Sequence, residues 1–373
     1  MTGAHARRNG GFLPARRTAR LVVAVFLALL PGVAWAHGDH EGPVGWGSWN
    51  ISPEITGGLL LMGLIYGAGL RKARGSGEAR KVMLHVAFYG GLVAFFIALQ
   101  SPVEVLADHI FFMHQIEHML LRTIGPMLVM LALPQAMLTR GLPRGIRRSV
   151  VSPVLDNGGV RGLFGFLTQP VVVTLLFVGV SLFWMIPSYH DRAILNEPVH
   201  YTWHLTLMIT GLLFFWRLFD PREQPAGASL ATRLVMFWTA SMGNILLGVY
   251  LSLKSTAIYH AYGILGRPWA IDPVRDERFG GLTMWIPGCM MFGAAALLLV
   301  HRWQAREERN QTRRMRVGGD QPVMARDFLA ARRPQNRMLA FWLGGFVLLV
   351  LIIAVSVAVL YDQTLAPHPY IPS

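Results

Sequence analysis

The sequence predicts an all-α polytopic membrane protein, a bundle of about eight transmembrane helices after a cleaved signal peptide. Hydrophobic residues make up 53% of the chain and charged residues only 14%. Apolar segments close to the roughly 20 residues of a membrane-crossing helix recur along it. A net charge of +14 would suggest nucleic acid as the partner of a soluble protein. Here the basic residues lie between apolar segments, where they set topology, so no nucleic-acid partner is expected.

The first 36 residues are expected to be a signal peptide that is removed. Arginines precede an apolar run at 21–30, which is too short to span a bilayer, and an Ala-x-Ala cleavage pattern follows at 34–36. Cleavage there places the new N-terminus, His37, outside the cytoplasm, and residues 37–54 then form an outer tail. The single cysteine, Cys289, lies within an apolar segment, so the chain cannot form an internal disulfide.

Eight apolar segments are expected to span the membrane, and the first is marginal in length. They lie at 55–70, 82–100, 114–138, 170–187, 199–219, 233–252, 280–301 and 339–361. The first seven form a membrane core at 55–301, and the eighth is an additional helix. Residues 302–338 form a basic cytoplasmic loop, and residues 362–373 form an outer tail.

The basic residues and the histidines lie on opposite sides of this predicted bundle. With the mature N-terminus outside, the inner connections hold 23 Lys and Arg residues and the outer connections hold five, as the positive-inside rule requires. In the same orientation, ten of the 13 histidines lie in outer segments or at the outer ends of spans. Core packing gives histidine no preference for one side of a bilayer, so a one-sided distribution indicates a function on that side. The sequence therefore predicts an outward-facing site.

Two histidine pairs are the candidate metal ligands of that site. His114 and His118 open one apolar segment, and His200 and His204 open another. At a spacing of four residues, both imidazoles of a pair lie on one helix face, one turn apart, where they can hold a metal ion between them. Four residues beyond the second pair lies Met208, and a thioether beside imidazoles suits copper, particularly Cu(I).

Further residues near the first pair are candidates for supporting roles. Met119 offers a second thioether, and His109 is a supplementary ligand or orients one. Arg122 continues the face of the first pair one turn deeper in the membrane, where a guanidinium needs a carboxylate, a backbone carbonyl or an anionic cofactor group as its partner. His190 and His260 lie in expected loops and are not assigned to the site.

Four functional interpretations remain open on residues alone. Copper binding is the preferred one. In a haem-handling or electron-transfer protein, the histidines would be axial ligands and Arg122 would meet a propionate. A metal permease would need polar residues toward the inner face, where the spans offer few. Finally, the string HQIEH at 114–118 matches the HxxEH pattern of zinc proteases, in which Glu117 would activate water.

Longer strings resemble the multi-span CtaG-type cytochrome c oxidase assembly factors. They read SPVEVLADHIFFMHQIEHMLLRTIGPMLVMLALP, SLFWMIPSYHDRAILNEPVHYTWHLTLMITGLLFFW, GNILLGVYLSLKSTAIYHAYG and DERFGGLTMWIPGCMMFGAAAL, in that order. Together they cover the region from about Ile51 to His301. The family usually has methionine where this chain has Gln115, and its core has about seven spans, so the signal peptide and the last helix are additions.

The resemblance implies a bacterial inner-membrane factor that acts around copper insertion into a haem-copper oxidase. Its expected partners are the oxidase subunits, the lipid bilayer and a periplasmic copper donor. Copper would be passed on by ligand exchange, so no enzymatic activity is expected. The resemblance does not by itself identify the ligands, which rest on the spacing of the histidines.

Overall fold

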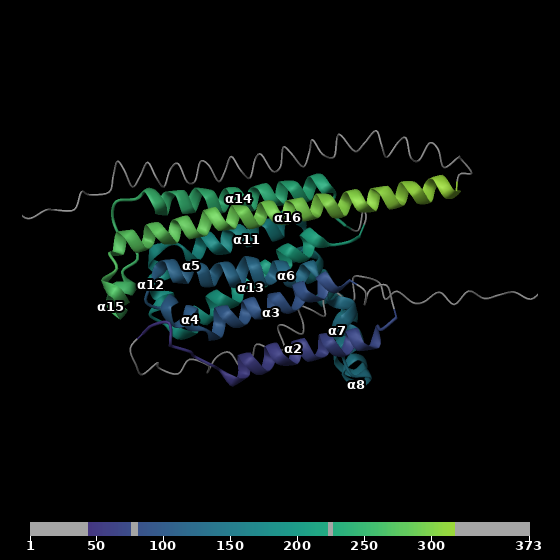
Figure 1. The fold of residues 1–373 in the computed structure, drawn as a ribbon, viewed down its shortest axis with the longest axis horizontal. Coiled ribbons are helices and arrows are strands. Elements are labelled where there is room, and N and C mark those ends of the chain that lie inside the picture. Colours follow the sequence, from purple (N-terminus) through teal and green to yellow (C-terminus); the bar gives the residue numbers. More distant parts are fainter. Residues whose placement is uncertain (1–43, 76–80, 223–226, 318–373) are drawn as a thin grey trace, which may run out of the picture. The chain divides into compact units, whose positions relative to one another are not determined.

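The computed structural model describes residues 44–75, 81–222 and 227–317. Every regular element within these ranges is helical (Figure 1). The expected signal peptide, the additional helix at 339–361 and the outer tail at 362–373 lie outside the described residues, as does the basic loop beyond residue 317.

Five of the described helices are long and apolar enough to cross a membrane. They are α2 (Pro53–Lys72), α3 (Val82–Gln100), α13 (Glu197–Phe219), α14 (Leu230–Leu253) and the Pro273–Ala305 part of α16 (Pro273–Val317). Their positions match five of the predicted spans, and they make the chain a membrane protein. The long helix α16 continues past its apolar part into the first residues of the predicted basic loop.

The segment predicted as one span at 114–138 is bent. It is built from α5 (Phe111–Met119), the π-helical turn η2 (Leu120–Ile124), α6 (Gly125–Leu131) and α7 (Gln135–Gly141). Between α6 and α7 the chain turns by 75°. Leu133 at the bend has a φ of 50°, and Pro134 follows it. Because proline disfavours the α conformation in the residue before it, the helix ends here and a new one starts.

The segment predicted at 170–187 is also part of a bent pair. Its helix is α11 (Pro170–Trp184), and α10 (Gly158–Leu167), which was expected to be loop, precedes it at an angle of 69°. Pro170 opens α11, where the fixed φ of proline suits the first helical turn. If each bent pair is one span, the described residues contain up to seven spans by length and composition, the number predicted for the core.

The described part of the chain divides into two compact units, and the first contains residues 120–173 and 196–219 together with the described residues before 106. Its shorter elements are α8 (Arg144–Ile146), η3 (Arg147–Val151) and α9 (Ser152–Asp156). In this unit α13 approaches the backbone of η2 closely, since a Cβ atom at Gly211 would overlap the carbonyl oxygen of Arg122. Small residues commonly permit such close helix contacts in membranes.

The second unit contains residues 106–119, 174–195 and the described residues from 220 to 317. It holds α5, most of α11, α14 and α16, together with the short elements α12 (Pro187–Ile194), α15 (Ala261–Leu265) and η4 (Pro268–Ala270). Helices α14 and α16 lie side by side (Figure 1). A Cβ atom at Gly281 would lie 2.7 Å from the carbonyl oxygen of Gly248, so glycine allows these two backbones to touch. The remaining short helix, α4 (Pro102–Ala107), leads from one unit to the other along the chain.

Candidate metal centre

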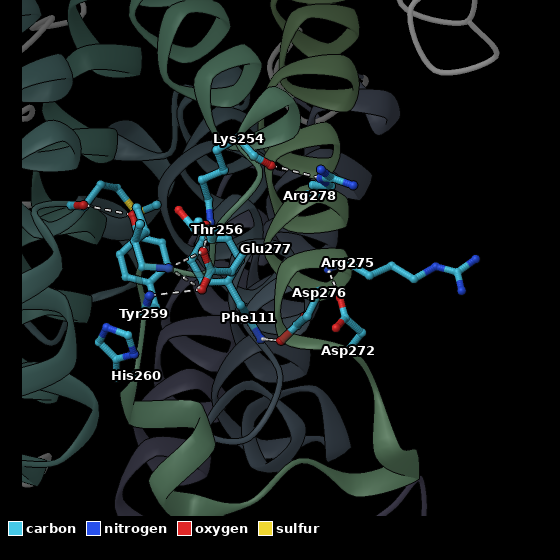
Figure 2. A network of polar contacts seen from close by, with 12 residues as sticks. Phe111, Lys254, Thr256, Tyr259, His260, Asp272, Arg275, Asp276, Glu277 and Arg278 are labelled. Atoms are coloured by element: carbon cyan, nitrogen blue, oxygen red, sulfur yellow. Dashed lines mark hydrogen bonds and ion pairs between the residues drawn. The ribbon is translucent and has the colours of Figure 1, made fainter. Parts of the chain in front are cut away.

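The helix that carries the first histidine pair is anchored at its N-terminus by a carboxylate from α16. The first backbone N–H groups of a helix have no carbonyl partner within the helix. At the start of α5, the N–H of Phe111 donates to Asp276 Oδ2 at 2.9 Å and the N–H of Phe112 donates to Oδ1 at 3.0 Å. Asp276 is fully buried, and Arg267 Nε donates to it at 3.2 Å. Figure 2 shows the contact between Phe111 and Asp276. The three hydrogen bonds to Asp276 fix the turn that presents His114.

The neighbouring acid, Glu277, fixes the loop that precedes α15. Its carboxylate accepts the backbone N–H groups of Ile258 and Tyr259 at 3.0 to 3.1 Å, and it pairs with Lys254. Figure 2 shows this carboxylate between the lysine and the loop. Because all three donors converge on one buried carboxylate, the loop and the start of α16 hold each other in place.

The two imidazoles of the first pair point their Nε2 atoms at one another. His114 Nε2 lies 2.6 Å from His118 Nε2, and the ring planes meet at 77°. Both side chains are buried. A contact this short between two ring nitrogens requires one N–H to donate to one bare nitrogen. The pair therefore presents two nitrogens to one small volume, as a metal chelate does.

The other ring nitrogen of His114 is held by a tyrosine. Tyr262 Oη lies 2.9 Å from His114 Nδ1 and 2.8 Å from Nε2 of His190. Both Tyr262 and His190 are fully buried. Burial raises the pKa of the Tyr262 phenol well above its ordinary value, so the hydroxyl keeps its proton and acts as a neutral hydrogen-bonding group.

Aromatic rings pack around this hydrogen-bonded chain. Phe111 stacks on Tyr259 with ring centroids 4.7 Å apart, and Tyr259 lies against His190 at 4.0 Å. The hydroxyl of Tyr259 donates to the carbonyl of Met185 at 2.9 Å. The rings exclude water from the side of His114 that faces away from His118, which strengthens the hydrogen bonds there.

The second pair lies in the first turns of α13. The ring centroids of His200 and His204 are 4.3 Å apart with 59° between the planes, as expected for neighbours one helical turn apart. Both side chains are buried, at 8% and 6% exposure. Burying two imidazoles next to each other near the end of an apolar helix has a desolvation cost, which hydrogen bonds or a bound metal ion must offset.

Each histidine pair offers two buried imidazoles, one helical turn apart, that could hold a metal ion between them. His114 and His118 belong to the second compact unit, and His200 and His204 belong to the first. Tetrahedral coordination with metal–nitrogen bonds of 2.0 to 2.1 Å separates two ligand nitrogens by about 3.3 Å. The 2.6 Å contact within the first pair would then widen by less than about 1 Å. The donor set therefore fits an ion that accepts imidazole nitrogen.

The other predicted site residues lie in different surroundings. His109 Nδ1 bonds to the carbonyl of Gly266 at 2.8 Å. Arg122 is buried in the π-helical turn η2. Met208 is buried one turn beyond His204, and Met119 is half-buried at the end of α5. Their roles as ligands or cofactor contacts stay predictions.

Sequence reasoning missed three residues that support the first pair. The sequence places His190 in an expected loop, and the predicted site residues include neither Tyr262 nor Asp276. They lie 72 or more positions from their partners along the chain, so no spacing rule joins them. All three residues lie in strings quoted for the family resemblance, His190 in the second, Tyr262 in the third and Asp276 at the start of the fourth, and that resemblance was the available signal.

Comparison with known proteins agrees with this architecture. Residues 64–306 match the model of the family described as "Cytochrome c oxidase caa3 assembly factor (Caa3_CtaG)". An uncharacterized protein of Mycobacterium leprae is 23% identical over 267 residues, which is 70% of this chain and 40% of the relative. An uncharacterized protein of Mycobacterium bovis is 22% identical over 277 residues, 71% of this chain and 40% of the relative.

The chain thus spans about 40% of the length of the curated relatives that it matches. No solved structure is significantly similar to it. The family match covers well over half of the chain and includes both histidine pairs, α15 and the apolar part of α16. The chain belongs to the family of cytochrome c oxidase caa3 assembly factors.

Proposed function

We propose that this assembly factor binds one copper ion through His114, His118, His200 and His204 and passes it to a nascent subunit of a haem-copper oxidase. The observation that carries the proposal is the presence of two pairs of buried imidazoles, in which His114 Nε2 lies 2.6 Å from His118 Nε2 and the ring centroids of His200 and His204 are 4.3 Å apart. Membership of a cytochrome c oxidase assembly family supplies the context, because such an oxidase must receive copper to become active.

The donor chemistry favours copper over harder cations. Imidazole suits zinc, copper, iron and nickel, whereas magnesium and calcium prefer oxygen ligands. Met208 lies one turn beyond His204 on the same helix, and Met119 directly follows His118. A thioether that joins the imidazoles would stabilise Cu(I) in particular. We therefore infer Cu(I) as the form carried, with Met208 or Met119 as supporting ligands.

Transfer is a ligand exchange, not a catalysed reaction of a substrate. During uptake, the histidines displace the ligands through which a periplasmic donor holds the ion. During release, ligands of the oxidase subunit displace the histidines. A site made of two separate pairs suits this task, because one pair can release the ion while the other still holds it. No covalent bond between non-metal atoms is made or broken, so the role is non-enzymatic.

We place the site at the outer face of a bacterial inner membrane. The support for this orientation is the distribution of basic residues, with 23 on the inner connections and five on the outer ones. Both histidine pairs then lie at the outer ends of their helices. A periplasmic copper donor and the oxidase subunit would reach them from that side.

The test is the copper content and affinity of the detergent-purified protein. The wild-type chain should bind one copper ion per chain, and replacing either pair by alanine should abolish binding while leaving the protein inserted in the membrane. His260→Ala is the matched control, because His260 is an exposed imidazole outside the four-histidine group, and it should bind copper as the wild type does. A double-alanine variant that stays fully loaded would refute the assignment.

The optical spectrum of the same sample separates the alternative functions. A Soret band would indicate haem with histidine axial ligands, and Arg122 would then be the candidate partner of a propionate. Zinc retained in preference to copper, with loss of proteolysis on Glu117→Gln, would indicate the HxxEH protease. Copper with no Soret band supports the proposal.

A further inference from the structure

Tyr262 joins two buried imidazoles that lie far apart in the sequence. Its hydroxyl oxygen is 2.9 Å from Nδ1 of His114 and 2.8 Å from Nε2 of His190. All three residues belong to the same compact unit, and all three are completely buried. Such a buried chain of hydrogen bonds is ordered throughout, because each member loses its partner if another turns away.

The position of Tyr262 is fixed from the element that also carries His190. Asp191, the next residue in α12, accepts the N–H groups of His260 and Ala261 at 3.1 and 3.2 Å. These groups lie at the N-terminus of α15, where helix N–H donors need outside partners. One short helix therefore positions the backbone before Tyr262 through Asp191 and the phenol hydroxyl through His190.

The Tyr262 hydroxyl can bridge the two imidazoles with its hydrogen bonds running in either of two directions. If the Tyr262 hydroxyl donates to one of the two imidazole nitrogens, it can bond to the other only by accepting an N–H from it. If the Tyr262 hydroxyl donates to His114 Nδ1, that nitrogen carries no proton, and the neutral ring of His114 is protonated on Nε2. If His114 Nδ1 donates instead, Nε2 of His114 is bare.

Only the second direction leaves His114 able to bind a metal ion through Nε2, the atom that faces His118. A metal-ligating histidine almost always donates its other ring N–H to an outer partner, which fixes both the tautomer and the ring orientation. The phenol of Tyr262 stands at the position of that partner, and its hydroxyl donates a hydrogen bond to Nε2 of His190.

We propose that Tyr262 and His190 are positioning residues that hold His114 with Nδ1 protonated and Nε2 presented to copper. The inference rests on the proposed copper function of the histidine pairs. In the metal-free protein, this arrangement leaves His114 Nε2 without a proton, so His118 Nε2–H is the donor of the hydrogen bond between the two rings. The tyrosine thus orients one ligand of the pair without touching the ion.

The test compares Tyr262→Phe with Tyr259→Phe. Both substitutions remove a phenol hydroxyl from a buried tyrosine of the same loop region, but the Tyr259 hydroxyl bonds to the carbonyl of Met185 and not to a histidine. Tyr262→Phe should weaken copper affinity about 10- to 100-fold, as loss of an outer hydrogen-bond partner does at other metal sites. Tyr259→Phe should bind copper as the wild type does.

A spectroscopic measurement distinguishes positioning from a general loss of structure. In protein loaded with Cu(II), electron spin echo modulation reports the quadrupole coupling of the remote nitrogen of a bound imidazole, which responds to the hydrogen bond that this nitrogen makes. The coupling assigned to His114 Nδ1 should change in Tyr262→Phe and stay constant in Tyr259→Phe. His190→Gln, which keeps a polar group near the phenol, should lose less affinity than His190→Ala.

The outcomes separate this inference from the proposed function. A wild-type protein that binds no copper refutes the proposed function, and the positioning role falls with it. A wild-type protein that binds copper while Tyr262→Phe shows the same affinity and the same remote-nitrogen coupling refutes the positioning role alone. If Tyr262→Phe does not fold, the two His190 variants decide the question by the same two measurements.

Discussion

Replacing Asp276 by asparagine should loosen the helix that presents the first histidine pair. The carboxylate accepts two backbone N–H groups at the start of α5, from Phe111 and Phe112, and a third bond from Arg267. Asparagine keeps one acceptor oxygen but turns an NH₂ group toward the second N–H. One buried charge-assisted hydrogen bond is lost, which costs about 1.5 to 3 kcal/mol in the free energy of unfolding.

Asp272→Asn is the matched control for this prediction. Asp272 is exposed and accepts the backbone N–H of Arg275 at 2.8 Å in the first turn of α16 (Figure 2). Asparagine caps helices about as well as aspartate does, so this variant should change the free energy of unfolding by less than about 0.5 kcal/mol.

Reversible unfolding of the detergent-solubilised protein, followed by circular dichroism, measures both variants. Copper affinity should fall with stability in Asp276→Asn, because the first turn of α5 carries His114. Equal stability losses in the two variants, or unchanged copper affinity in Asp276→Asn, would show that the carboxylate does not hold α5.

Three further predictions concern packing, the glutamate of the first pair and the buried tyrosines. Gly211→Ala should lower the free energy of unfolding by about 1 to 3 kcal/mol, because the added methyl group overpacks against η2. In the control Gly179→Ala, the Cβ meets no atom within 4 Å, so the free energy of unfolding should not fall. Equal effects of the two substitutions would contradict the close contact at Gly211. Glu117→Gln should leave the copper content unchanged, and loss of copper would make Glu117 part of the site. Since burial raises the pKa values of Tyr259 and Tyr262, the unfolded chain should release these protons first, and stability should decline as the pH rises above about 10. Tyrosinate absorbance should then be lower in the folded than in the denatured protein at that pH, and equal absorbance would refute this.

The sequence predicted the spans well because apolar length is a local property. Five predicted segments coincide with single long helices to within a few residues at most ends. The bends before Gln135 and Pro170 were not predicted, although a proline marks each one. A proline only ends or tilts a helix, and the angle between the two pieces depends on what packs beside them.

The histidine pairs could be predicted for the same reason, since a spacing of four residues fixes the face on which both rings lie. The contacts that support the first pair could not be predicted from the sequence. His190 and Asp276 act on α5 through tertiary contacts, which no periodicity reveals. The loop position of His190 was therefore misleading, because α12 holds it in the buried cluster around Tyr262.

X-ray absorption at the copper edge of the loaded protein is the most direct test of one ion shared by both pairs. We expect one copper per chain with imidazole nitrogens as the main ligands, and loss of that copper when either His114 and His118 or His200 and His204 are replaced by alanine. Two copper ions per chain, each with two imidazoles and each surviving replacement of the other pair, would contradict a single four-histidine site.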